Sequence, residues 1–184
     1  LYFMALSSIH QKSQLPYVSG IVQRPRLLNK IQLALEHKLT LICAPPGYGK
    51  STLTAQFVQS QSYPFAWHSV EERQRDIGNL QAQTTSSLKY LVPDVQTLAN
   101  IPGYSARELA AALANHIRET AEGDIVFVMD DVHLLTGSPA AETWLRTFVS
   151  LLPTNCHLIL LSRVLPDLPL TEMIARREVL AIGQ

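Results

Sequence analysis

The sequence predicts an α/β fold in which an open, mostly parallel sheet of five strands lies between two layers of helices. Short apolar runs typical of strands buried on both faces alternate with stretches whose apolar residues recur at helical spacing. Such alternation makes consecutive strands parallel, because each pair is joined by a crossover helix. With 184 residues, 47% of them apolar, the chain is long enough for one domain with a substantial core.

The first twenty residues contribute little to this prediction. Leu1-Tyr2-Phe3, which precede Met4, resemble a cloning remnant, and the rest of residues 1–20 is expected to be a poorly fixed lead-in. The domain is therefore expected to span residues 21–184. Its first helix is predicted within residues 21–38, where four apolar side chains form one stripe: Leu27, Leu28, Ile31 and Leu35.

The motif around which the chain is organised is APPGYGKST, residues 44–52. It follows an apolar strand at 39–43, precedes a helix expected over 53–60, and fits the phosphate-binding loop G-x-x-x-x-G-K-[ST], except that Ala44 replaces the first glycine. The positive N-terminal end of the helix points at the anion that such a loop binds. Strand, loop and helix in this order predict a nucleotide-binding protein.

Each residue type in this loop has a chemical role. Gly47 and Gly49 allow the backbone to curl so that successive N–H groups point at phosphate oxygens. Lys50 is expected to reach the β- and γ-phosphates, and the Ser51 hydroxyl to join the shell of a Mg²⁺ ion. The residues of the loop expected to bind the nucleotide are Pro46, Gly47, Tyr48, Gly49, Lys50, Ser51 and Thr52.

A second motif ends the apolar run at residues 125–129, where Asp130 and Asp131 follow. In open α/β sheets the carboxyl ends of the strands form the edge that binds ligands. Adjacent residues of a strand point to opposite sides, so the two carboxylates are expected to differ in role. We assign Asp130 to Mg²⁺ and Asp131, as a catalytic residue, to the water that attacks the γ-phosphate.

The remaining elements follow in order. A strand is predicted over 65–70, a helix from Asp76 to Leu91 and a loop over 92–104. Another helix opens with the capping box Ser105–Glu108, and a further one follows Ser138-Pro139. The last three elements predicted are a strand at 156–161, a short helix at 171–177 and a strand at 179–182.

Three further residues are candidates for the nucleotide site. Arg163 follows the fourth buried strand, where a cation can sense the γ-phosphate and stabilise charge that develops during its transfer, which makes it the second catalytic candidate. Val22 and Arg24, a short hydrophobic hook with an arginine, either cover the adenine or belong to a helix that only packs on the domain.

Composition excludes several other classes. The formal net charge is zero, and no helix-turn-helix signature is present, which argues against direct nucleic-acid binding by these residues. The two cysteines lie in apolar runs without metal-ligand spacing. No signal peptide or membrane span is visible, so we expect a cytoplasmic protein. A GTPase is set aside, because no N-K-x-D motif follows a strand.

Four motifs together resemble the nucleotide-binding domain of STAND-class signalling ATPases, and more closely that of MalT-like, large LuxR-type transcriptional regulators. They are RPRLL (24–28) with CAPPGYGKSTL (43–53), the Ala66-Trp67 strand with Asp76, VMDDVHLL (128–135), and LLSRVLPDLPL (160–170). Alanine at position 44 is usual in that family. The segment 71–75, EERQR, departs from the family's Asp-rich stretch, so its role stays open.

The resemblance implies a P-loop NTPase of the additional-strand (ASCE) type, with one strand inserted between the phosphate-loop strand and the Asp-Asp strand. It also implies a domain truncated from a longer regulator, in which ATP favours self-association, slow ATP hydrolysis resets the switch, and only an absent C-terminal domain contacts DNA. An AAA-like remodelling ATPase and a small-molecule kinase are the alternatives. A kinase would need an arginine-rich lid, and none is visible. Arg176 or Arg177 could act as the trans arginine of a remodelling ATPase.

Overall fold

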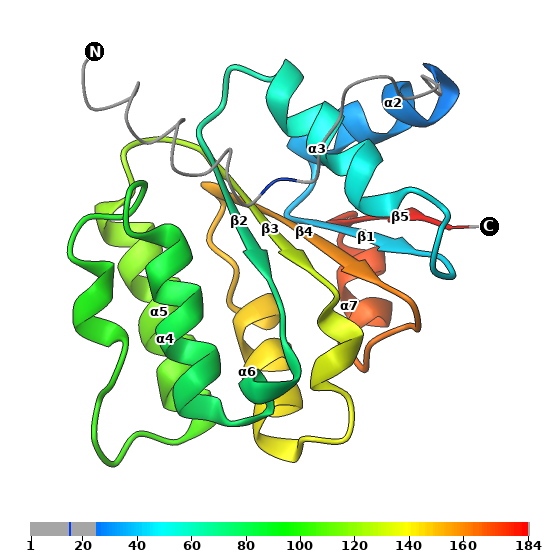
Figure 1. The fold of residues 1–184 in the computed structure, drawn as a ribbon. Helices are drawn as coiled ribbons and strands as arrows, with labels where there is room; N and C mark the ends of the chain where they lie inside the picture. Colours follow the sequence, from blue (N-terminus) through cyan, green and yellow to red (C-terminus); the bar gives the residue numbers. More distant parts are fainter. Residues whose placement is uncertain (1–14, 16–24, 184) are drawn as a thin grey trace.

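The structure, a computed structural model, describes residue 15 and residues 25–183, and its five strands form one sheet in the order β2-β3-β4-β1-β5 (Figure 1). All four pairings are parallel. The strands are β1 (Leu39–Cys43), β2 (Phe65–Ser69), β3 (Ile125–Asp130), β4 (Cys156–Ser162) and β5 (Val179–Ile182). β4 lies between β1 and β3, so the predicted α/β fold with an additional strand is confirmed.

Helices cover both faces of the sheet. The helices are α2 (Pro25–Gln32), α3 (Lys50–Ser60), α4 (Ile77–Leu88), α5 (Ala106–Thr120), α6 (Pro139–Ser150) and α7 (Leu170–Ala175). Figure 1 shows α2 and α3 on one face and α4, α5 and α6 on the other. Four 3₁₀ turns complete the described part: η1 (Leu33–Glu36), η2 (Glu72–Arg75), η3 (Val95–Leu98) and η4 (Val132–Leu135).

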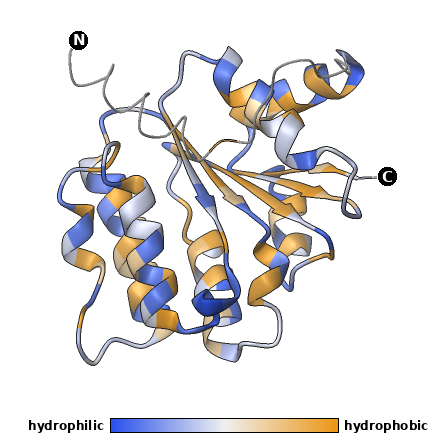
Figure 2. Ribbon diagram, viewed as in Figure 1, coloured by the Kyte–Doolittle hydropathy of each residue, from blue (hydrophilic) through white to orange (hydrophobic). Residues whose placement is uncertain are grey.

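Two hydrophobic cores explain the continuous apolar strands. Along β3, Val126 and Val128 pack with α3, whereas Phe127 and Met129 pack on the side of α4, α5 and α6. Because successive side chains point to opposite faces, a strand buried on both faces needs no polar positions. Figure 2 shows this as strands coloured hydrophobic along most of their length. Cys156 belongs to the second core, where burial raises the pKa of its thiol to about 12.

Most helix boundaries follow the predicted caps. The capping box of Ser105 and Glu108 opens α5, and the Ser138 hydroxyl accepts from the Ala141 N–H at the start of α6. Three helices differ from their predicted bounds, and one of them, α7, spans Leu170–Ala175 where residues 171–177 were predicted. α4 ends at Leu88 and not at Leu91, and the stretch 92–104, predicted as a loop, contains η3. The phosphate-loop helix starts at Lys50, three residues earlier than predicted, because the apolar stripe begins only at Leu53.

Candidate nucleotide-binding site

The phosphate loop joins β1 to α3 at the carboxyl edge of the sheet. Gly47 and Gly49 have φ of 81° and 75°, and a Cβ built on either meets no atom within 4 Å. The loop therefore needs glycine at these two positions for backbone conformation and not for space. Ala44 is not among the residues with positive φ, and its N–H donates to Ser162 O at 3.2 Å. A methyl group is tolerated there because position 44 does not adopt the positive φ that favours glycine.

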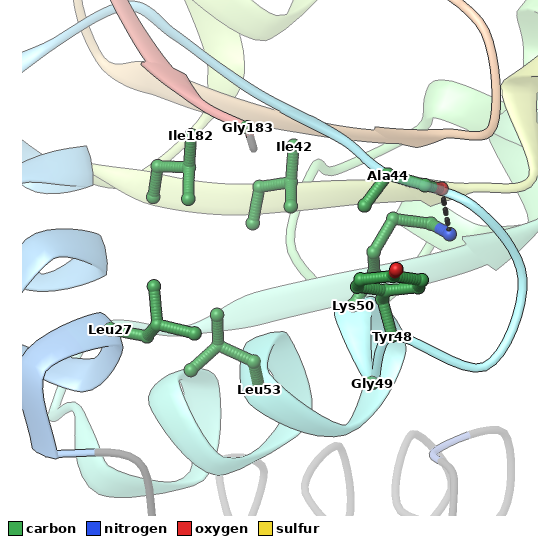
Figure 3. Close-up of a pocket in the computed structure, with 9 residues that line it drawn as sticks. All are labelled: Leu27, Ile42, Ala44, Tyr48, Gly49, Lys50, Leu53, Ile182 and Gly183. Atoms are coloured by element: carbon green, nitrogen blue, oxygen red, sulfur yellow. Dashed lines mark hydrogen bonds between the residues drawn. The ribbon is translucent and has the colours of Figure 1, made fainter.

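Lys50, the first residue of α3, folds back over the loop. Its ammonium donates to Ala44 O at 2.6 Å and to Pro45 O at 3.1 Å, and Figure 3 shows the first of these bonds as a dashed line. An ammonium has three donors, so one remains for a phosphate oxygen while the other two hold the loop. Tyr48 is 49% exposed. Pro46 is exposed as well, and Thr52 lies half-buried on α3.

Asp130 is the last residue of β3 and is 7% exposed. Its carboxylate accepts hydrogen bonds from the Ser51 side chain and, at 2.8 Å, from the Asp131 N–H. Burial raises the pKa of this carboxyl, the neighbouring Asp131 charge adds to the rise, and the Ser51 bond and Lys50 oppose it. The structure thus brings Ser51 and Asp130 together, as a shared metal site requires.

Asp131 corrects one step of the sequence interpretation. It does not continue the strand: its φ is 57°, and it precedes the 3₁₀ turn η4. The carboxylates of Asp130 and Asp131 therefore separate because the chain turns sharply, and strand alternation is not the reason. Left-handed backbone is uncommon outside glycine, although aspartate adopts it more readily than most residues.

Two side chains face Asp131. Arg163 Nε lies 4.0 Å and His133 Nδ1 lies 3.6 Å from Asp131 Oδ1. His133 Nδ1 is buried without a hydrogen-bond partner among the described residues. Burial lowers the pKa of His133, Asp131 counteracts this, and the Arg163 and Lys50 charges lower it further. The charges that act on His133 thus come from the ends of three neighbouring strands, β1, β3 and β4, through Lys50, Asp131 and Arg163.

An apolar pocket of about 130 Å³ opens beside the phosphate loop. In Figure 3, Leu27 of α2 and Leu53 of α3 point toward Ile42 of β1 and Ile182 of β5. The remaining lining residues are Ala44, Tyr48, Gly49, Lys50 and Gly183. The sequence did not reveal this pocket, because isolated apolar residues on helices and strands look like ordinary core positions. Val22 and Arg24, the predicted adenine hook, lie outside the described residues.

Comparisons with known proteins agree with this geometry. Residues 34–165 match the AAA domain family. The chain is 32% identical over 179 residues to the HTH-type transcriptional regulator MalT of Yersinia pestis (strain Pestoides F), covering 90% of this chain and 19% of that protein. The chain thus spans about a fifth of the length of the curated relative that it matches.

Two solved structures share the fold. One is a STAND protein with a tetratricopeptide-repeat sensor from Pyrococcus horikoshii, with a TM-score of 0.52, 17% identity, and coverage of 92% of this chain and 24% of that chain. The other is the Aeropyrum pernix ORC1 protein, with a TM-score of 0.54, 16% identity, and coverage of 91% and 47%. The chain belongs to the AAA domain family, and its resemblance to the MalT-like STAND nucleotide-binding domain is confirmed.

Proposed function

We propose that residues 21–184 form the ATP/ADP-binding switch domain of a signal-activated transcriptional regulator, in which slow ATP hydrolysis resets the switch. The observation that carries this proposal is the Arg163–Asp131 pair beside the phosphate loop. A cation that faces a carboxylate at 4.0 Å has an alternative partner once a γ-phosphate enters the same region. ATP and ADP differ by that group alone.

The apolar pocket is suited to the base of the nucleotide. An adenine ring is flat and largely apolar on its faces, and the pocket offers aliphatic side chains from α2, β1, α3 and β5. Lys50 and Gly49 lie at one side of it, so a base held there leaves its phosphates directed into the loop. Val22 and Arg24 are proposed to add to this pocket from the preceding segment.

Mg²⁺ is proposed as the metal. The Ser51 hydroxyl and the Asp130 carboxylate are already hydrogen-bonded partners, and both are hard oxygen donors. Among the described residues no group of three or more His, Cys, Asp or Glu side chains could hold a metal ion. Two protein donors suffice for Mg²⁺, which usually keeps several waters and binds substrate phosphates. When bound, the ion neutralises charge on the β- and γ-phosphates.

The residues of this chain then divide the work of hydrolysis. Lys50 binds the phosphates, Asp131 orients or deprotonates the attacking water, and Arg163 stabilises charge that develops on the γ-phosphate. His133 Nδ1 lies 3.6 Å from Asp131 Oδ1, beside that carboxylate but without a hydrogen bond to it. Asp131 and Arg163 are both about half exposed, so the site needs a closing element or partner to exclude water, which is consistent with a slow ATPase.

Self-association and DNA binding are proposed for the longer protein. The Yersinia pestis relative is named an HTH-type transcriptional regulator, and this chain covers 19% of it. In the proposal, DNA is contacted by a segment outside the present chain, and the ATP state of the full-length protein self-associates. No helix in the described part of the chain is long and apolar enough to cross a membrane.

The decisive experiment compares the full-length protein with its Lys50→Ala variant by sedimentation in Mg²⁺ with ATP, with ADP and without nucleotide. We expect larger species only with ATP and only in the parent protein. Assembly that does not depend on nucleotide would refute the switch. Extraction and chromatography of nucleotide from the purified protein would identify the resting ligand.

A remodelling ATPase is the alternative that retains a specific feature. Arg176 and Arg177 are exposed at the end of α7, directly before β5, where a trans-acting arginine would lie. Fast, concentration-dependent turnover by the isolated chain, lost in an Arg176→Ala, Arg177→Ala double variant, would favour this alternative over a slow switch.

A further inference from the structure

The 3₁₀ turn η2 is tied to the turn that follows Asp131. Arg75, its last residue, donates from Nε to Leu134 O at 3.0 Å and from Nη2 to Thr136 O at 2.8 Å. The Ser138 hydroxyl in turn donates to Arg75 O at 2.7 Å. One residue thus binds the segment 134–138 through both its side chain and its backbone.

The carbonyls that Arg75 holds belong to the turn that orients Asp131 and His133. Within this turn, Leu134 N donates to Asp131 O at 3.0 Å, and Thr136 N donates to His133 O at 3.1 Å. Asp131 has a left-handed backbone, a conformation that persists only where surrounding contacts determine it. The guanidinium supplies two of those contacts, and its planar fork matches two carbonyls better than a single ammonium does.

The other end of this connection is anchored in the core. Gln74, next to Arg75, is buried, and its Oε1 accepts from His68 Nε2 at 2.7 Å. His68 lies on β2, and its Nδ1 lies 3.3 Å from the Thr84 hydroxyl of α4. η2 is therefore fixed to β2 and α4, so Arg75 extends from a rigid support toward the turn after β3.

We propose that Arg75 is a positioning residue for ATP hydrolysis, which acts by clamping the η4 turn so that Asp131 and His133 keep their orientation. This proposal rests on the proposed function, and it gives a role to the segment 71–75. Arg75 reaches Asp131 only through the turn. Its loss is therefore expected to affect hydrolysis far more than nucleotide binding, which depends on the phosphate loop.

The chain offers a matched control. Arg73 lies in the same turn, is exposed like Arg75, and its guanidinium pairs with Glu71 at 2.7 Å. Arg73→Ala removes the same charge and side-chain length from η2 without touching the η4 turn. Arg75→Lys keeps the charge but can hold the two carbonyls only loosely, so it is expected to fall between Arg75→Ala and the parent.

The first measurement is amide hydrogen exchange of the nucleotide-free protein over residues 130–138. Arg75→Ala is expected to accelerate exchange at Leu134 and Thr136 about tenfold or more, and Arg73→Ala to leave it unchanged. Equal protection in both variants would overturn the clamp. This readout is independent of ATP hydrolysis.

The second measurement is single-turnover hydrolysis of Mg·ATP, together with calorimetric ATP affinity. Arg75→Ala is expected to slow hydrolysis about tenfold while the Kd for ATP changes less than about threefold. The double variant Arg75→Ala, Asp131→Asn should be no slower than Asp131→Asn alone. Additive losses, or an affinity loss equal to the rate loss, would overturn the positioning role. A parent protein that binds no ATP or hydrolyses none would refute the proposed function itself, and the exchange data would still decide whether the clamp exists.

Discussion

Arg163 Nε lies 4.0 Å from Asp131 Oδ1, and the two residues reach this position from the ends of different strands. β3 and β4 are hydrogen-bonded neighbours in the sheet, and β4 also pairs with β1, whose end opens into the phosphate loop. The inserted strand thus carries a cation to the boundary between the proposed water-orienting carboxylate and the proposed γ-phosphate position. Both side chains are partly exposed, so the pair contributes little to stability.

Arg163→Ala should weaken ATP relative to ADP. The guanidinium is assigned to the γ-phosphate, and a hydrogen bond to a charged group contributes about 1.5–3 kcal/mol, which corresponds to roughly a 10- to 100-fold change in the ATP/ADP affinity ratio. Calorimetric titrations with Mg·ATP and Mg·ADP measure that ratio. Arg146→Ala is the control. Arg146 lies on α6 and pairs with Asp167, which belongs to the same loop after β4 as Arg163, so this variant also removes an arginine charge near that loop. An unchanged ratio in the Arg163 variant would count against the γ-phosphate assignment.

Lys50→Ala and Asp131→Asn should separate binding from hydrolysis. Lys50 holds the phosphate loop through Ala44 O and Pro45 O and is assigned to the phosphates, so its removal is expected to abolish nucleotide binding. Asp131→Asn keeps the shape of the turn but removes the base, which is expected to cut hydrolysis by about 10²–10⁴-fold with ATP affinity nearly intact. Fluorescent-nucleotide binding and phosphate release measure the two effects. Equal loss of binding in both variants would refute the division of labour.

The fold was predictable because its signals are local. Five apolar runs, the capping box at Ser105 and the Ser138-Pro139 start each depend on neighbouring residues, and all appear in the structure. The position of β4 between β1 and β3 is a non-local pairing, which the family resemblance supplied and the apolar patterns did not.

The site was predictable only where its residues form a sequence motif whose residue types and spacing are needed for one kind of chemistry. The phosphate loop and Asp130-Asp131 carry such a signature. The Arg75 contacts do not, because an arginine in a polar segment is indistinguishable from a solvated one until its carbonyl partners, about sixty residues away, are known. The left-handed φ of Asp131 was likewise not predictable from the sequence, since it depends on the turn that surrounds this residue.

His68 should make the stability of the domain sensitive to acid. Burial lowers its pKa from 6.5 to about 4, against the opposing effects of the Gln74 hydrogen bond and the Glu71 charge. The folded state binds this proton less readily than the unfolded chain does. The contribution of neutral His68 to the free energy of unfolding is therefore fully present above pH 6.5 and is lost as the pH falls toward 4. The loss across this window is on the order of 3 kcal/mol.

His68→Gln is expected to flatten the part of the stability profile between pH 6.5 and 4, whatever its effect on the absolute free energy of unfolding. Urea denaturation at a series of pH values measures that slope. His116→Gln serves as the control, because His116 is half-buried on α5, away from the His68–Gln74 pair, and its ring Nε2 bonds to Pro93 O. Identical slopes for the parent and the His68 variant would show that other groups dominate acid unfolding.

Gly47→Ala should impair the phosphate loop, whereas Ala44→Gly should not improve it. A Cβ at position 47 meets open space, but the backbone has a φ of 81°, so the alanine variant is strained by about 1–2 kcal/mol in the binding conformation of the loop. If the nucleotide-free loop relieves this strain, nucleotide affinity falls roughly 10-fold. Gly47→Asn should lose less affinity, because asparagine tolerates left-handed backbone.

Ala44 is not among the residues with positive φ, so glycine at position 44 restores the general motif without relieving strain. It should leave affinity within about twofold and lower stability by up to about 1 kcal/mol through the entropy of the unfolded chain. Calorimetry and urea denaturation of the three variants test this ordering, and a tighter-binding Ala44→Gly protein would contradict it.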